Sequence, residues 1–366
     1  MMHKNQFSRF SFCMAVSGLV LSFIACTPKQ SGSGAQQATT GVSARVVNLA
    51  IWSNYISPEQ LADFKAKTGI RVQVSNYSSN EELLAKLQAG ASGYDVVVPS
   101  DYMVFAMSKL ALLRELDYSQ LPNAKSLDSK FLKKSFDPEN KYSVPYDWGT
   151  TGIAVNRTLY PGVIKSWKDL FEKEDLAGKF SLLDDAREVL GAALRVFGYS
   201  VNSKDPEHWE KAKQLLMKAR RRVKSFTSEP LMSLVNGEVA VAQIFMSDAL
   251  QARKLTDGKV EYLVPEEGGT LWIDNLVVPA SAKNIKEAHE FMNFLLEART
   301  NAATVTSIFV GPANKGTFAL LPKEFQNNSI LFPPPSVLSK SEMMEDLGDF
   351  LPKVDRVWTE VKANSH

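Results

Sequence analysis

The strongest constraint on the fold is a regular alternation of strand and helix signals near the start of the folded part of the chain. β-Prone apolar segments alternate with segments that open on helix-capping residues and carry apolar residues one turn apart. In order, they are a strand over Val46–Trp52, a helix over Ser57–Gly69, a strand over Ile70–Val74, a helix from Asn80 and a strand over Tyr94–Val98. This order predicts an α/β lobe with a mainly parallel sheet.

The residues that follow these strands are the first candidate binding positions. In open α/β sheets, ligands bind beyond the carboxyl ends of the strands. Trp52-Ser53-Asn54-Tyr55 follow the first strand, and Ser100-Asp101-Tyr102 follow the third. Trp52 and Tyr55 would equally suit a hydrophobic core, so their position leaves both interpretations open.

A second α/β unit is predicted in the middle of the chain. The extended, glycine-punctuated segment Tyr142–Thr151 continues as a strand over Gly152–Val155, which we interpret as a crossing between two lobes. Helices and strands then alternate again, with helices over Asp184–Phe197, Asp205–Arg222 and Ser247–Lys254 and strands over Val239–Ile244 and Tyr262–Val264. Two more helices are expected over Asn284–Glu297 and around Val354–Val361.

Trp272 and Asp274 form the clearest candidate for recognition of a cation. They lie just before the apolar strand Leu276–Val278, and because they are two residues apart, an extended backbone points both side chains to the same side. A carboxylate offers charge-assisted hydrogen bonds and an aromatic ring offers a cation–π surface, which together suit a small organic cation. The alternative is a core tryptophan beside an aspartate in a turn.

Composition and motifs argue against several classes of function. The formal net charge of +2 at pH 7 gives no sign of a nucleic-acid surface. No Gly-x-Ser-x-Gly motif, glycine-rich phosphate loop or His/Cys metal spacing is present in the sequence. We therefore expect no enzyme activity, no cofactor, no metal ion and no nucleic-acid partner.

The N-terminal residues have the features of an export signal. Lys4 and Arg9 precede an apolar run over Ser11–Ala25, which is too short to span a membrane stably. Phe23-Ile24-Ala25-Cys26 resembles a bacterial lipobox, so we expect a signal peptide over residues 1–25 and a lipid on Cys26. Residues 26–45 would then be a flexible, lipidated tether. The alternative is an ordinary signal peptide cut nearby.

Taken together, these segments resemble the periplasmic spermidine/putrescine-binding proteins, which are the solute receptors of polyamine ABC transporters. The resemblance extends from Asn48 to the C-terminus and is carried by Trp52–Tyr55, Tyr94–Ser100, Tyr142–Tyr146, Asp184–Val189 and Trp272–Asp274. It implies a two-lobed periplasmic-binding-protein fold that closes on its ligand like a hinged clamp. The first lobe would comprise residues 46–149 and 274–318, and the second residues 150–273 and 319–366.

The resemblance also implies a set of ligand-binding residues. The first lobe would contribute rings and polar groups from Trp52, Ser53, Asn54, Tyr55, Ser100 and Tyr102. Further rings and carboxylates would come from Asp185, Glu188, Phe245, Trp272 and Asp274. Trp272 would stack on the methylene chain of a polyamine and Asp274 would pair with an ammonium group. For Asp185 and Glu188, a pair that caps a helix is the structural alternative.

Four positions depart from the family pattern. Asn54 stands where an acid is usual, Phe245 where a tryptophan is usual and Val310 where a tyrosine is expected, while a glutamine is expected near Met344. A neutral amide accepts a hydrogen bond from an ammonium group but does not offset its charge. We therefore expect a tilt towards diamines such as putrescine, with general polyamine binding better supported than spermidine in particular.

The expected function is capture of a polyamine by a monomeric receptor, in the periplasm or anchored to a membrane, and its delivery to an ABC permease in the inner membrane. A receptor of the same fold for a sugar, ferric ion or anion is one alternative, and a polyamine sensor for a signalling partner is another. An anion site would favour a helix start free of acids. Here the predicted helix start carries Asp184, Asp185 and Glu188.

Overall fold

The computed structural model of the 366-residue chain describes residues 45–90 and 93–363. The predicted signal peptide, Cys26 and nearly all of the predicted tether lie outside the described residues. No helix in the described ranges is long and apolar enough to cross a membrane.

The predicted strand–helix alternation at the start of the fold is confirmed. Its strands are β1 (Val46–Trp52), β2 (Arg71–Tyr77) and β3 (Val96–Val97), and its helices are α1 (Pro58–Thr68), α2 (Asn80–Gln88) and α3 (Asp101–Lys109). Ser57 and Gln60 form a reciprocal capping box that begins α1, and Gly69 ends it in the left-handed conformation, with φ at 73°. β1 pairs in parallel with both β2 and β3.

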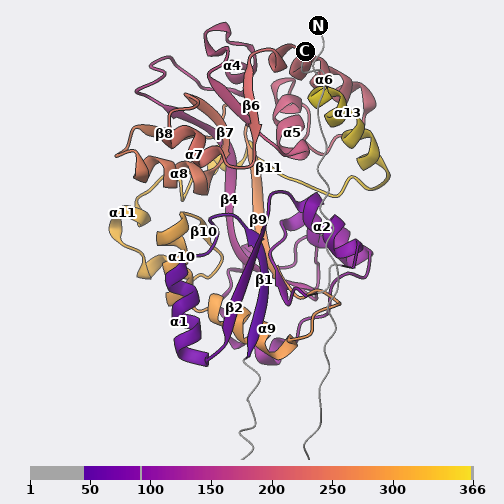
Figure 1. Cartoon of the computed structure of the whole chain (residues 1–366), viewed down its shortest axis with the longest axis vertical. Helices are drawn as coiled ribbons and strands as arrows, with labels where there is room; N and C mark the ends of the chain where they lie inside the picture. Colours follow the sequence, from indigo (N-terminus) through magenta and orange to yellow (C-terminus); the bar gives the residue numbers. More distant parts are fainter. Residues whose placement is uncertain (1–44, 91–92, 364–366) are drawn as a thin grey trace, which may run out of the picture. The chain divides into compact units, whose positions relative to one another are not determined.

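Two long strands, β4 (Ser143–Asn156) and β9 (Thr270–Val277), cross the middle of the sheet. They pair with each other in antiparallel fashion, and Figure 1 shows them running side by side. Every residue of β4 is buried, which fits a strand covered on both faces. The segment predicted as a crossing is therefore one continuous strand rather than an extended linker that leads into a shorter strand.

The sheet follows the order β2-β1-β3-β9-β4-β7-β5-β6, with the short strands β8, β10 and β11 joined to β4 and β9. Parallel pairing is confirmed for the strands flanking the centre, where β1 pairs with β2 and β3, and β5 pairs with β6 and β7. The prediction of a mainly parallel sheet needs a correction at the centre, because β4 is antiparallel to β7, β8 and β9. Strands that return the chain between two α/β units run against the strands within them.

The second α/β unit surrounds the far half of β4. Its strands are β5 (Phe180–Leu183), β6 (Val223–Thr227), β7 (Val241–Phe245) and β8 (Val260–Leu263). Its helices are α4 (Trp167–Glu172), α5 (Ala186–Val196), α6 (Pro206–Arg220), α7 (Pro230–Val235), α8 (Met246–Leu255) and the C-terminal α13 (Leu351–Ala363). The helices predicted from Asp184, Asp205 and Ser247 are thus confirmed within a few residues, whereas β5, β6, α4 and α7 were not predicted.

Besides short 3-10 helices, the remaining elements are α9 (Ile285–Leu295), α10 (Ala298–Ile308), β10 (Gly311–Pro312), α11 (Lys323–Gln326), α12 (Pro335–Leu338) and β11 (Glu342–Met343). One large hydrophobic cluster joins β1, α1 and α9 to the first half of β4, and another joins α5, α6 and α13 to β5. These are the two largest of five core clusters among the described residues, and they lie on the two halves of β4, as two lobes would require. The exact lobe boundaries near residues 150 and 273 stay a prediction.

Candidate functional site

A cavity of about 930 Å³, including its open mouth, lies where β1, α3, α5, β7 and β9 meet. All eleven sequence-predicted site residues line it: Trp52, Ser53, Asn54, Tyr55, Ser100, Tyr102, Asp185, Glu188, Phe245, Trp272 and Asp274. Residues from distant parts of the sequence therefore share one wall. Their contact with a ligand stays a prediction.

The cavity wall is strongly acidic. Seven carboxylate residues line it, namely Asp101, Asp184, Asp185, Glu188, Glu229, Asp248 and Asp274. Among the described residues on this wall there is no lysine, arginine or histidine. Three of the seven acids are among the predicted ligand-binding residues. Asp101 lies in the segment predicted to follow the third strand and Asp184 at the predicted helix start, so the acids that only the structure adds are Glu229 and Asp248.

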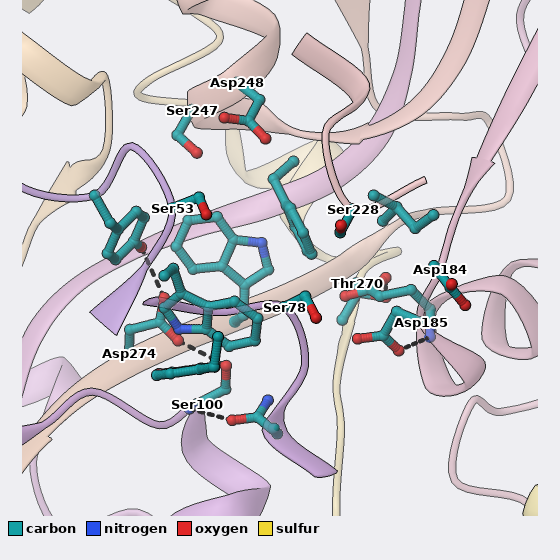
Figure 2. Close-up of a pocket in the computed structure, with 18 of the residues that line it drawn as sticks. Ser53, Ser78, Ser100, Asp184, Asp185, Ser228, Ser247, Asp248, Thr270 and Asp274 are labelled. Atoms are coloured by element: carbon teal, nitrogen blue, oxygen red, sulfur yellow. Dashed lines mark hydrogen bonds between the residues drawn. The ribbon is translucent and has the colours of Figure 1, made fainter. Parts of the chain in front are cut away.

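Asp274 is held at one side of the cavity by two hydroxyl groups. The Ser100 Oγ atom donates to Asp274 Oδ1 at 2.7 Å, and the Tyr55 hydroxyl lies 2.7 Å from Asp274 Oδ2. Figure 2 shows Ser100 beneath Asp274, with the hydrogen bonds dashed. Burial raises the pKa of Asp274 to about 6, although both hydroxyl contacts act to lower it. The carboxylate is therefore positioned by the fold before any ligand arrives.

Asp185 and Glu188 form a second acidic group, at the start of α5. The Asp185 side chain caps this helix by accepting a hydrogen bond from the Glu188 backbone N–H at 3.0 Å. The Glu188 carboxylate instead accepts hydrogen bonds from the Thr151 and Thr270 hydroxyls, at 3.0 and 2.9 Å. The capping interpretation is thus correct for Asp185, and it does not keep either residue from lining the cavity. Burial, with the charge of Asp185, raises the pKa of Glu188 to about 8.

A third acidic group was missed by the sequence reasoning. Asp248 lies in the first turn of α8, three residues after Phe245, and Glu229 immediately precedes α7. Burial, with the charge of Glu229, raises the pKa of Asp248 to about 7. Figure 2 places Asp248, Asp185 and Asp274 at three separate sides of the cavity. The short spacing from Phe245 was the signal available, because it puts both residues near the same strand-to-helix turn.

Asp101 and Asp184 have partners within the protein. Asp101 Oδ1 accepts from its neighbour Tyr102 N–H at 2.7 Å, and its Oδ2 accepts from Ile273 N–H at 3.3 Å. Asp184 forms an ion pair with Lys362 at 2.5 Å. These contacts give both acids a structural role.

Aromatic rings form another part of the wall. The ring of Phe245 lies between those of Trp52 and Trp272, with centroids 6.3 Å from each. The indole of Trp272 packs so closely on Gly149 that a Cβ atom there would lie 2.4 Å from the ring. Trp272 therefore belongs to the core, as the alternative interpretation held, and also lines the cavity. Such rings can cover the methylene chain and the charges of an organic cation.

The positions that depart from the family pattern divide into two kinds. Asn54 and Phe245 line the cavity, and so does Met344. Val310 is fully buried and is not among the lining residues. Asn54 adopts the left-handed conformation, with φ at 57°, which asparagine and aspartate tolerate better than most residues.

A cation lies behind the wall rather than on it. The Arg187 guanidinium is 5.2 Å from the centroid of the Tyr102 ring, and it donates to Asn202 Oδ1 at 3.2 Å. Within the described ranges, no cluster of His, Cys, Asp and Glu has the arrangement of a metal site.

Comparison with known proteins identifies close relatives. The family model for bacterial extracellular solute-binding proteins matches residues 59–333. The spermidine/putrescine-binding periplasmic protein 1 of Haemophilus influenzae is 36% identical over 359 residues, covering 97% of this chain and 99% of the relative.

Two solved structures resemble this one. A spermidine/putrescine ABC transporter protein of Listeria monocytogenes superposes with a TM-score of 0.83 at 34% identity, covering 87% of this chain and 99% of the other. The Tp0655 lipoprotein of Treponema pallidum gives a TM-score of 0.76 at 29% identity, over 86% and 99% of the two chains.

Proposed function

The chain belongs to the bacterial extracellular solute-binding proteins, and from this premise we propose that it captures a polyamine such as putrescine or spermidine between its two lobes. It acts on the periplasmic side of the inner membrane and delivers the polyamine to an ABC permease. As a solute receptor, it is expected to have no catalytic activity and to act as a monomer.

The observation that carries this proposal is the acidic cavity with an aromatic wall and no basic residue among its described lining residues. A polyamine brings two or more ammonium groups, and each needs a partner once it is desolvated. Carboxylates lie on three sides of the cavity: Asp274 on one, Asp185 with Glu188 on another and Asp248 on the third. Trp52, Phe245 and Trp272 supply apolar surface for the methylene groups. The same acids oppose an anion, and a neutral sugar would bring no positive charge to pair with them.

Calorimetric titration of the purified mature protein tests this function. Putrescine, cadaverine, spermidine and spermine are the ligands, and glucose and citrate are the controls. We expect saturable binding of at least one polyamine and no binding of glucose or citrate. Binding of citrate or glucose with no polyamine binding would contradict the proposal.

Asn54 provides a test of selectivity. Asn54→Asp is expected to strengthen spermidine binding by about 1–3 kcal/mol, the scale of a hydrogen bond to a charged group, and to help putrescine less. The left-handed backbone of Asn54 also suits aspartate, so the substitution should not strain the turn. Parallel titrations of both ligands measure the difference. If spermidine affinity stays the same or falls, Asn54 is not a ligand contact.

We also propose that the mature protein is anchored by a lipid on Cys26, as the lipobox-like segment Phe23–Cys26 suggests. The Treponema pallidum relative is itself named a lipoprotein. In detergent phase separation, the wild-type protein should enter the detergent phase. Cys26→Ser should move it to the aqueous phase or leave the signal uncut. A wild-type protein that is found in the aqueous phase, with a mature N-terminus other than Cys26, would rule out the anchor.

A further inference from the structure

A buried acid, Asp147, lies directly behind the cavity wall. It is a β4 residue with no exposed surface, and it is not among the residues that line the cavity. Asp147 is paired across the strands with Asp274 of β9. A shift of register between Pro145 and Asp147 places Tyr146 as an extra residue, so a β-bulge brings the two acids opposite each other.

Like charges directly opposite each other on neighbouring strands destabilise a sheet. Between these two acids lies a single phenol group. The Tyr55 hydroxyl is 2.7 Å from Asp147 Oδ1 and 2.7 Å from Asp274 Oδ2. Both separations are typical of an O–H···O hydrogen bond, which needs one proton for each contact. A tyrosine hydroxyl carries one proton, so the second must belong to one of the two carboxyl groups.

The surroundings decide which acid keeps that proton. Asp274 receives a further hydrogen bond from Ser100, which favours its ionised form. Asp147 Oδ2 has no hydrogen-bond partner among the described residues, so nothing but Tyr55 stabilises an Asp147 anion. Burial and the charge of Asp274 raise the pKa of Asp147 well above its usual range. Three other titratable groups lie near this pair. The charge of Asp147 acts to raise the pKa of Tyr146, and the charge of Asp274 acts to raise the pKa values of Asp101 and Tyr77.

We propose that Asp147 is a positioning residue for the polyamine site: a neutral carboxylic acid that donates to Tyr55, so that Tyr55 must donate its own proton to Asp274. This inference rests on the proposed function, because it assigns Asp274 as the ionised member of the Asp147–Tyr55–Asp274 chain, with which an ammonium group would pair. The chain of hydrogen bonds fixes the direction of the Tyr55 hydroxyl and leaves other lone pairs of Asp274 for an ammonium group. Asp147 adds no charge of its own.

Two substitutions at Asp147 separate a donor from a charge. Asp147→Asn keeps a donor of similar size, since the amide can donate to Tyr55, and should bind the preferred polyamine within about threefold of the wild type. Asp147→Ala removes the donor and should weaken binding about tenfold, and so should Tyr55→Phe, which removes the middle of the chain. Calorimetric titrations in buffers of different ionisation enthalpy measure the number of protons released when the polyamine binds. This number should be the same for Asp147→Asn as for the wild type.

A second measurement needs no ligand. A carboxyl group whose pKa is higher in the folded than in the unfolded protein contributes most to stability at low pH and loses that contribution as the pH rises. The wild type should lose this contribution as the pH rises, whereas the amide of Asp147→Asn does not ionise. The Tm of the variant minus that of the wild type should therefore increase by about 2–6 °C between pH 5 and pH 8. Glu324→Gln, at an exposed position, is the control and should show no such trend.

Each result separates this inference from the proposed function. If the wild type binds no polyamine, the function fails, whereas the pH dependence of Tm still reports on Asp147. The Asp147→Asn variant could instead bind the polyamine more than tenfold more weakly than the wild type and release one proton fewer on binding. This would show that Asp147 ionises when the ligand binds. That result, or a Tm difference that does not change with pH, would overturn the inference.

Discussion

Asp274→Asn is expected to weaken polyamine binding by about 2–4 kcal/mol, because it removes the charged partner of a buried ammonium group. Ser100 and Tyr55 already hold the carboxylate with hydrogen bonds of 2.7 Å, so the ligand need not order it. An amide in its place can accept a hydrogen bond through its single oxygen from one of these hydroxyls, and it does not offset the ligand's charge. Calorimetric titration of the variant and the wild type measures the loss.

Asp184→Asn is the matched control for this variant. Asp184 lines the same cavity, but its carboxylate is paired with Lys362 and its side chain is 40% exposed. We expect the polyamine affinity of Asp184→Asn to stay within about threefold of the wild type.

Trp272→Ala should weaken polyamine binding by about as much as Asp274→Asn, because it removes stacking and cation–π contact. Binding that survives both the Asp274 and the Trp272 changes within a factor of two would exclude this site.

Polyamine affinity is expected to rise at least about tenfold between pH 5 and pH 7, since each proton released on binding contributes up to tenfold per pH unit. The pKa values of Asp274, Asp248 and Glu188 are raised to about 6, 7 and 8, respectively. At pH 5 the empty cavity therefore holds protons that an ammonium group must displace. Affinity should level off above about pH 8, where these acids are ionised without a ligand.

The empty protein should show the opposite trend. Its cavity acids bind protons more tightly in the folded than in the unfolded chain, so the free energy of unfolding should fall as the pH rises from about 4 to 8. Thermal unfolding at several pH values, with and without polyamine, measures both effects, and the Tm gain from ligand should be largest at the highest pH. Asp248→Asn should flatten the pH dependence of binding. Affinity that is independent of pH would show that the acids are already ionised in the empty cavity.

The fold was largely predictable because its signals are local. Ser57 and Gly69 mark the ends of α1, and the apolar alternation of Val46–Trp52 marks β1, as the structure confirms. The antiparallel centre was not predicted, because strand direction depends on how β4 pairs with distant β7 and β9. β5 is a run of four buried residues that carries no clear period of its own.

For the candidate site, the sequence determined which side chains share a face and which residues follow a strand. A period of two placed Trp272 and Asp274 together, and the motif resemblance gathered the other predicted residues, all of which line one cavity. The role of each as a ligand contact stays a prediction.

Only the tertiary structure decided what lies around these residues. Asp248 and Glu229 reach the cavity from α8 and from the residue before α7, and no local pattern near Asp274 indicates either. Asp147 faces Asp274 only because a bulge at Tyr146 shifts the register of two strands more than a hundred residues apart in the sequence. Local periodicity sets the face on which a side chain lies, but the residue opposite it on the next strand depends on long-range pairing. Burial among such neighbours then raises the pKa values of these acids.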